Sequence, residues 1–130
     1  MIHFDIIFEK YDWMVEVYII LEHANNERIL NSLDCMKCPE KIKEQAEENL
    51  HSGVNSGFTY TNPKIRKSLM VVNRSSSMYE FINTYNHEKN HVEMHICEEL
   101  GVDPYSEEAA YLSGELASQL FLPALCSFVM

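Results

Sequence analysis

The sequence predicts an α+β fold, in which a small mixed or antiparallel sheet is followed by a long helix and a C-terminal helix. Segments rich in β-branched and aromatic residues lie in the first part of the chain, stretches with helical apolar spacing fill the last part, and no segment is repeated. The chain has 130 residues, of which 46% are hydrophobic and only four are Gly and four Pro. This size and composition predict one globular domain over residues 1–130.

The first four expected elements are two strands and two short helices. Residues 13–21 are rich in β-branched and aromatic types and predict a strand, and residues 2–8 predict a strand before it. Asn25 or Asn26 can cap a helix, because Asn side chains accept hydrogen bonds from the free N–H groups of a first turn. Pro39 suits the first turn of the next helix, because its missing N–H is not needed there.

A hairpin is expected in the middle of the chain. Residues 58–60 and 68–73 both have strand composition, and Asn62-Pro63 between them is typical of a turn. The two strands should therefore pair with each other.

Two helices are expected after the hairpin. Ser75-Ser76-Ser77 followed by Glu80 resembles a capping box, and apolar residues then recur at helical spacing until Gly101. Ser106 can cap a last helix that is expected to end near Pro123.

Charge and local composition exclude several classes of partner. Twenty acidic residues against ten basic ones give a net charge of −10, which repels nucleic acid and anionic membranes. The N-terminal residues lack the pattern of a signal peptide, and no apolar run approaches the ~20 residues that span a bilayer. We therefore expect a cytoplasmic protein with reduced cysteines, and the sequence does not indicate an oligomeric state.

The chemistry of the expected long helix lies in His87-Glu88-Lys89-Asn90-His91, a His-Glu-x-x-His motif. Residues four apart lie above one another on a helix, so both imidazoles can bind one zinc ion. Glu88 can contact a water on that ion and act as the general base, with zinc lowering the pKa of the water toward ~7. Hydrolysis of a peptide bond is the reaction that this set predicts.

A catalytic zinc site needs a third protein ligand, and three residues are candidates. His95 continues the spacing but lies about 12 Å along the helix axis from His87, too far to share one ion, so it is expected to support a ligand, contact substrate or be an ordinary polar residue. Glu108 lies on the apolar stripe of the last helix and is the predicted ligand. Glu107, on the neighbouring stripe, is the alternative.

Residues 75–121 resemble the zincin metallopeptidases, and within them the gluzincin pattern, in which a Glu on a following helix completes the metal site. The similarity is to short ImmA/IrrE-like peptidase domains of bacteria and their phages or mobile elements, on the motif at 87–91 and the segment Glu107-Glu108-Ala109-Ala110. The resemblance implies that His87, His91 and Glu108 are ligands of one zinc ion and that Glu88 is the base.

The resemblance also carries expectations about substrate binding. Zincins bind peptide antiparallel to the edge strand of their sheet, and Ser68 to Asn73 is the candidate edge strand here. No clear motif supplies a group that stabilises the oxyanion, so Tyr105, Tyr111 and His95 stay open as candidates.

The prediction is a zinc-dependent metallopeptidase acting on a peptide or protein substrate. The alternative is a zincin-like metal-binding protein that binds a partner protein without cleaving it, because 130 residues leave little room for a second lobe around a substrate cleft.

Overall fold

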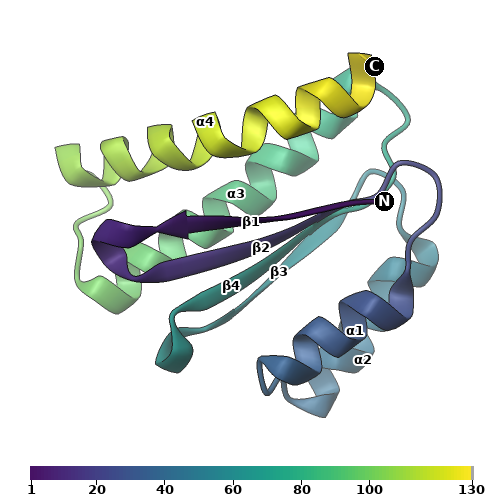
Figure 1. The fold of residues 1–130 in the computed structure, drawn as a ribbon, viewed down its shortest axis with the longest axis horizontal. Helices are drawn as coiled ribbons and strands as arrows, with labels where there is room; N and C mark the ends of the chain where they lie inside the picture. The colour runs from purple at the N-terminus through teal and green to yellow at the C-terminus, as the bar shows by residue number, and fades with distance from the viewer. Residues whose placement is uncertain (130) are drawn as a thin grey trace.

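The computed structural model is an α+β structure with one four-stranded sheet and helices on both of its faces (Figure 1). It describes the backbone of residues 1–129, and the side chains up to Phe121 together with those of Pro123 and Cys126. The strands are β1 (Ile2–Phe8), β2 (Trp13–Ile19), β3 (Gly57–Asn62) and β4 (Lys67–Val72), the helices are α1 (Asn26–Cys35), α2 (Glu40–Ser52), α3 (Met78–Leu100) and α4 (Glu107–Val129), and short 3-10 turns are η1 (Glu9–Tyr11) and η2 (Pro63–Ile65).

Local sequence signals account for most helix ends. Asn25 caps α1 and accepts a hydrogen bond from the N–H of Arg28, and Ser77 caps α3 by accepting from the N–H of Glu80. Gly101 ends α3 with a φ of 67°, a left-handed conformation that glycine adopts without strain.

The prediction that the last helix ends near Pro123 is wrong, because α4 continues through this residue to Val129. A proline inside a helix removes one backbone hydrogen bond but does not by itself end the helix.

The sheet has the order β1-β2-β4-β3. The hairpins β1–β2 and β3–β4 are antiparallel, and β2 and β4 are parallel at the centre. The expected hairpin in the middle of the chain is therefore confirmed, and the sheet is mixed.

The two faces of the sheet bury two separate cores. On one face, Val15 and Val17 of β2 pack with residues of α3 and α4 such as Val92 and Leu116. On the other face, Tyr18 packs with residues of α1 and α2, which the side-chain alternation of a strand requires. The molecule thus has three layers, with the sheet in the middle (Figure 1).

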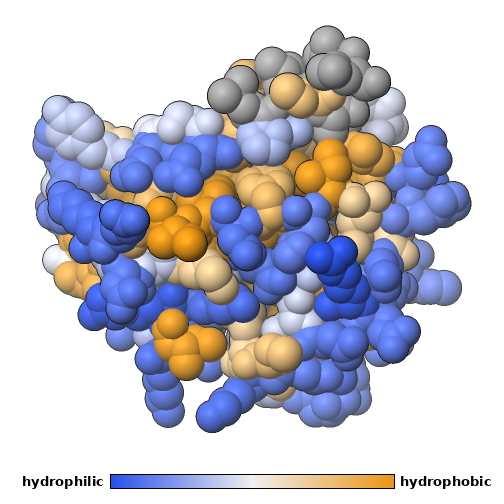
Figure 2. All heavy atoms as spheres, viewed as in Figure 1, coloured by the Kyte–Doolittle hydropathy of each residue, from blue (hydrophilic) through white to orange (hydrophobic). Residues whose placement is uncertain are grey.

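Helices α3 and α4 run antiparallel along one face of the sheet. The ammonium of Lys89 donates to Ser113 Oγ at 3.2 Å, and one turn earlier on α3 the Tyr85 hydroxyl donates to the carbonyl oxygen of Ala117 at 3.2 Å. These contacts place the first turn of α4 beside the C-terminal half of α3. Figure 2 shows hydrophobic atoms gathered between α4 and the β1 edge, and no helix among residues 1–129 is long and apolar enough to cross a membrane.

Candidate functional site

The two motif histidines lie next to each other on α3. Their Nε2 atoms are 3.2 Å apart, and the ring centroids are 4.8 Å apart. Tetrahedral zinc with Zn–N bonds of ~2.0–2.1 Å separates two ligand nitrogens by about 3.3–3.4 Å. The spacing of His87 and His91 therefore suits two ligands of one ion, and it also suits a hydrogen bond between the two rings.

Glu88 lies beside this pair, but it is buried against β3. The residue is 4% exposed, its Oε1 accepts a hydrogen bond from Thr59 Oγ1 at 2.9 Å, and its Oε2 is 3.9 Å from His87 Nε2. The close approach depends on Gly57, because a Cβ there would lie 3.0 Å from Glu88 Cγ and 2.3 Å from a backbone oxygen. One carboxylate oxygen is thus held by β3 while the other faces the histidine pair.

His95 lies one turn further along the same side of α3. Its ring centroid is 6.2 Å from that of His91, and its Nδ1 is 2.7 Å from Thr61 Oγ1 on β3. Burial, followed by the neighbouring charge of His91, lowers the pKa of His95, which favours the neutral imidazole.

Glu108 does not lie with the histidine pair. Its Oε1 accepts a hydrogen bond from the Tyr11 hydroxyl at 3.2 Å, and the ammonium of Lys10 is 4.0 Å away. The sequence spacing along α4 indicates which face of the helix Glu108 occupies, but not how far along α3 it lies. Because the two helices pack antiparallel, Glu108 lies near the C-terminal end of α3. In this structure Glu108 is a surface residue at η1 and not a partner of His87 and His91.

The other predicted site residues also lie apart from the motif. Glu107 is exposed at the start of α4, and Tyr105 and Tyr111 are 96% and 73% exposed. Over the part of the chain that the structure describes, neither tyrosine makes a hydrogen bond or ring contact with a histidine. His95 is the member of this group that the structure brings to the motif.

The prediction that Ser68 to Asn73 forms the edge strand is wrong. Residues 67–72 form β4, which is hydrogen-bonded to β2 on one side and to β3 on the other. The edge strand beside the motif is β3, whose Thr59 and Thr61 contact Glu88 and His95. An extended peptide could pair here only with β3.

The donor set fits zinc in part. His87 and His91 have the spacing of two ligands and Glu88 lies beside them, but no third ligand joins them within the described residues. Within the described residues, one group of three possible metal ligands has all its ligand atoms within 4.8 Å of one another. This group is His3, Asp5 and Glu16.

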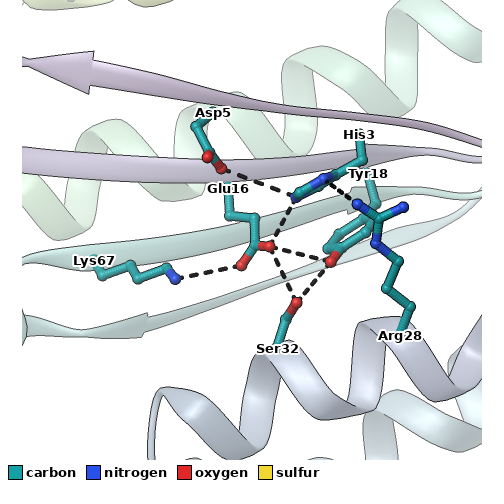
Figure 3. Close-up of polar contacts among 7 residues, drawn as sticks. All are labelled: His3, Asp5, Glu16, Tyr18, Arg28, Ser32 and Lys67. Carbon is teal, nitrogen blue, oxygen red and sulfur yellow. Dashed lines mark hydrogen bonds and ion pairs between the residues drawn. The ribbon is translucent and has the colours of Figure 1, made fainter.

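That set belongs to a second polar cluster, on the opposite face of the sheet (Figure 3). We call it the Glu16 cluster. Its residues line or adjoin a cavity of about 580 Å³ between α1 and the sheet. Its members are Glu16, His3, Asp5, Tyr18, Arg28, Ser32 and Lys67.

Glu16 is the centre of this cluster and is only 8% exposed. Its Oε2 accepts a hydrogen bond from His3 Nε2 at 2.8 Å and lies 3.1 Å from both the Tyr18 and the Ser32 hydroxyl, and Lys67 Nζ lies 3.4 Å from Oε1. The two hydroxyls are 2.6 Å apart, so one of them donates to the other, and the second donates to Glu16. Burial raises the pKa of Glu16, but the His3 hydrogen bond, the Lys67 charge and the two hydroxyls lower it by more in sum. Glu16 is therefore ionised in the folded protein.

The contacts of His3 define its tautomer and argue against a metal in this cluster. Arg28 Nη2 is 2.8 Å from His3 Nδ1, and a guanidinium can only donate, so Nδ1 accepts. Nε2 then carries the hydrogen that is donated to Glu16. An Nε2 that carries a hydrogen has no lone pair for a metal, and Glu16 Oε2 already accepts hydrogen bonds from His3 and from a hydroxyl.

Sequence reasoning missed the Glu16 cluster, although a signal was present. Glu16 is a lone acid within the apolar run from Trp13 to Ile20. Charged residues are rarely buried unless they are paired, so a charge in a strand of this kind indicates buried partners.

The fold and these side chains define an α+β protein with a histidine–glutamate motif at the sheet edge and a buried polar cluster on the other face. Comparison of the chain with protein-family models, curated proteins and solved structures finds no match in any of the three.

Proposed function

We propose that this chain is a zinc-dependent metallopeptidase of the zincin class, with its active site between α3 and the edge strand β3. The observation that carries the proposal is the 3.2 Å spacing of the Nε2 atoms of His87 and His91, with the carboxylate of Glu88 3.9 Å from His87 Nε2. Two imidazoles at ligand spacing beside a carboxylate are the chemistry of this class.

The roles of the chain's own residues follow from their positions. His87 and His91 would hold the ion, which supplies Lewis acidity and an acidified water when it is bound. Glu88 Oε2 accepts a proton from the attacking water, the remaining hydroxide adds to the carbonyl carbon, and Glu88 returns the proton to the amine nitrogen as the C–N bond breaks. Thr59 holds Oε1 and so orients Oε2 toward the histidines.

The substrate would be an extended peptide paired with the free edge of β3. An edge strand offers unpaired N–H and C=O groups, and peptides bind such edges by strand addition. Glu88 itself contacts β3 through Thr59, and His87 precedes it on α3, so a peptide paired with β3 would pass close to both residues.

Metal content and turnover of purified full-length protein test the proposal. Protein prepared without chelators should carry about one equivalent of zinc, His87→Ala and His91→Ala should lose it, and His51→Ala, a histidine exposed on α2, should keep it. Because Glu108 lies at η1, Glu108→Ala should also keep the zinc. Zinc below about a tenth of an equivalent in the wild-type chain would contradict the proposal.

Glu88→Gln separates metal binding from catalysis. This variant should keep zinc but lose cleavage of fluorescently labelled casein, because the amide cannot take the proton of the water. If the wild type binds zinc and cleaves nothing in this assay or in a mixture of unstructured peptides, the peptidase proposal fails.

One observation favours a second candidate function, a metal-binding protein that binds a partner without cleaving it. Within the described residues the donor set stops at two histidines, and the side chain of His87 is 68% exposed. Catalytic zinc sites have three protein ligands, so a partner protein could supply the missing one. Zinc binding that is equal in the wild type and Glu88→Gln, with no hydrolysis by either, would support this candidate.

A further inference from the structure

The three histidines on the β3 side of α3 are equally spaced in sequence but differ in structure. The rings of His87 and His91 converge to an Nε2–Nε2 distance of 3.2 Å, whereas the His91 and His95 ring centroids are 6.2 Å apart. His95 is held away from the pair by its contact with Thr61. The structure therefore gives His95 a different environment from that of the two motif histidines.

A chain of hydrogen bonds connects His95 to the core of the protein. Trp13 Nε1 donates to Ser68 Oγ at 3.1 Å, Ser68 Oγ is 2.8 Å from Thr61 Oγ1, and Thr61 Oγ1 is 2.7 Å from His95 Nδ1. Trp13 is 1% exposed and Ser68 is 0% exposed, so water does not reach the first members of this series of hydrogen bonds.

The direction of each hydrogen bond in this chain follows from the chemistry of its first member. An indole N–H can only donate, so Ser68 Oγ accepts from Trp13. The single hydroxyl hydrogen of Ser68 is fully buried and needs an acceptor, which Thr61 Oγ1 provides. The hydroxyl hydrogen of Thr61 then points to His95 Nδ1, which is its remaining partner among the described residues.

This direction fixes the tautomer of His95. A neutral imidazole carries one hydrogen, and if Nδ1 accepts from Thr61, then the hydrogen is on Nε2. An Nε2–H group cannot bind a metal ion, but it can donate a hydrogen bond to an oxygen atom.

We infer that His95 donates a hydrogen bond from Nε2 to a carbonyl oxygen of the bound peptide, and that Thr61 and Ser68 are positioning residues that hold it in this tautomer. The substrate part of the inference rests on the proposed function, because it needs a peptide carbonyl next to the histidine pair. His95 lies one turn of α3 beyond His91 on the same side of the helix, with the two ring centroids 6.2 Å apart. A donor aimed at the oxygen on which charge develops stabilises the transition state.

The tautomer can be measured without substrate or metal. Long-range ¹H–¹⁵N correlation spectra of the ¹⁵N-labelled full chain at neutral pH should show the His95 proton on Nε2 and none on Nδ1. Thr61→Val and Ser68→Ala each interrupt the series of hydrogen bonds and should each give a mixture of His95 tautomers. Thr59→Val, which removes a hydroxyl that contacts Glu88 instead, should leave the His95 tautomer unchanged. A proton on Nδ1 of His95 in the wild type would overturn the inference.

The role toward substrate is tested with the zinc-loaded chain and labelled casein. His95→Ala should keep the zinc content of the wild type and lower kcat about a hundredfold, which is the usual effect of losing one such donor. His95→Gln places an amide N–H at similar reach and should recover part of this loss. Loss of zinc in His95→Ala would make His95 a ligand and overturn the inference.

The two proposals fail in different ways. If the wild-type chain lacks zinc or turnover, the proposed function fails and so does the substrate role of His95, while the spectra still report its tautomer. If the wild-type chain binds zinc and cleaves casein but His95→Ala is as active as the wild type, the inference alone fails.

Discussion

Replacing Glu16 by Gln tests whether the Glu16 cluster stabilises the fold through its charge. In the wild type, the ionised Oε2 accepts two hydrogen bonds, one from His3 and one from the hydrogen-bonded pair of hydroxyls on Tyr18 and Ser32. A hydrogen bond to a charged group contributes about 1.5–3 kcal/mol, and one between neutral groups about 0.5–1.5 kcal/mol. The amide oxygen of Gln keeps the two bonds in their weaker form, so the loss is about 1 kcal/mol for each bond.

The expected net change is smaller than the sum of these losses. A buried carboxylate costs free energy to desolvate, and Gln removes part of this cost. Lys67, whose side chain is 20% exposed, can also turn toward water once the charge is gone. We therefore expect Glu16→Gln to lower the free energy of unfolding by about 1 kcal/mol at pH 7.

The stabilisation that Glu16 contributes should depend on pH. The pKa of Glu16 is lowered in the folded protein, so its stabilisation is fully present above the unfolded value of ~4.3 and is lost as the pH falls through the folded pKa. The Gln variant has no such titration. The difference between wild type and variant should therefore shrink between pH 4 and the lowest pH at which both are folded.

Urea unfolding followed by tryptophan fluorescence can measure these differences, because the one tryptophan, Trp13, is 1% exposed in the native state. Glu47→Gln, an exposed acid on α2, is the control and should change stability by less than about 0.5 kcal/mol. A difference between wild type and Glu16→Gln that is the same at pH 7 and at pH 3 would refute the reasoning, because the charge of Glu16 would then contribute nothing.

Four further predictions follow, three on packing and one on a buried tyrosine hydroxyl. Gly57→Ala should destabilise the fold by about 1–3 kcal/mol in urea unfolding, because its Cβ would lie 2.3 Å from the backbone oxygen of Val71. Gly114→Ala on α4, where a Cβ meets nothing within 4 Å, should instead stabilise it by up to about 1 kcal/mol. Leu116→Ala should cost about 2–5 kcal/mol, because Leu116 is 0% exposed, and a smaller loss would show that α4 packs loosely on the sheet. Burial raises the pKa of Tyr85 to about 12, so an ultraviolet titration should show this phenol ionising last; its stabilisation is present below the ordinary value of 10.0 and is lost toward pH 12.

Short-range signals in the sequence predicted the local structure well. The caps at Asn25, Ser77 and Ser106 and the stop at Gly101 each depend on one residue and its immediate neighbours. The strand and helix types followed from residue composition over a few positions. Pro123 is the exception, because whether a helix survives a proline depends on what the rest of the helix packs against.

The predicted metal site mixed short-range and long-range information. His87 and His91 are four residues apart on one helix, so their proximity follows from helix geometry alone. Glu108 was assigned from a helical stripe and from the resemblance to gluzincins, and both leave open how far α4 slides along α3. The contact between Lys89 and Ser113 fixes that register and places Glu108 at η1.

The edge position of β3 could have been predicted from the compositions of β3 and β4. Residues 69–72 are Leu-Met-Val-Val, all of them buried, whereas residues 57–62 are Gly-Phe-Thr-Tyr-Thr-Asn, none of them fully buried. Strands covered on both faces are continuous apolar runs, and polar residues are typical of edge strands. The same polar character puts Thr59 and Thr61 opposite Glu88 and His95, so the composition that makes β3 an edge strand also provides the hydroxyls that hold the two side chains beside the histidine pair.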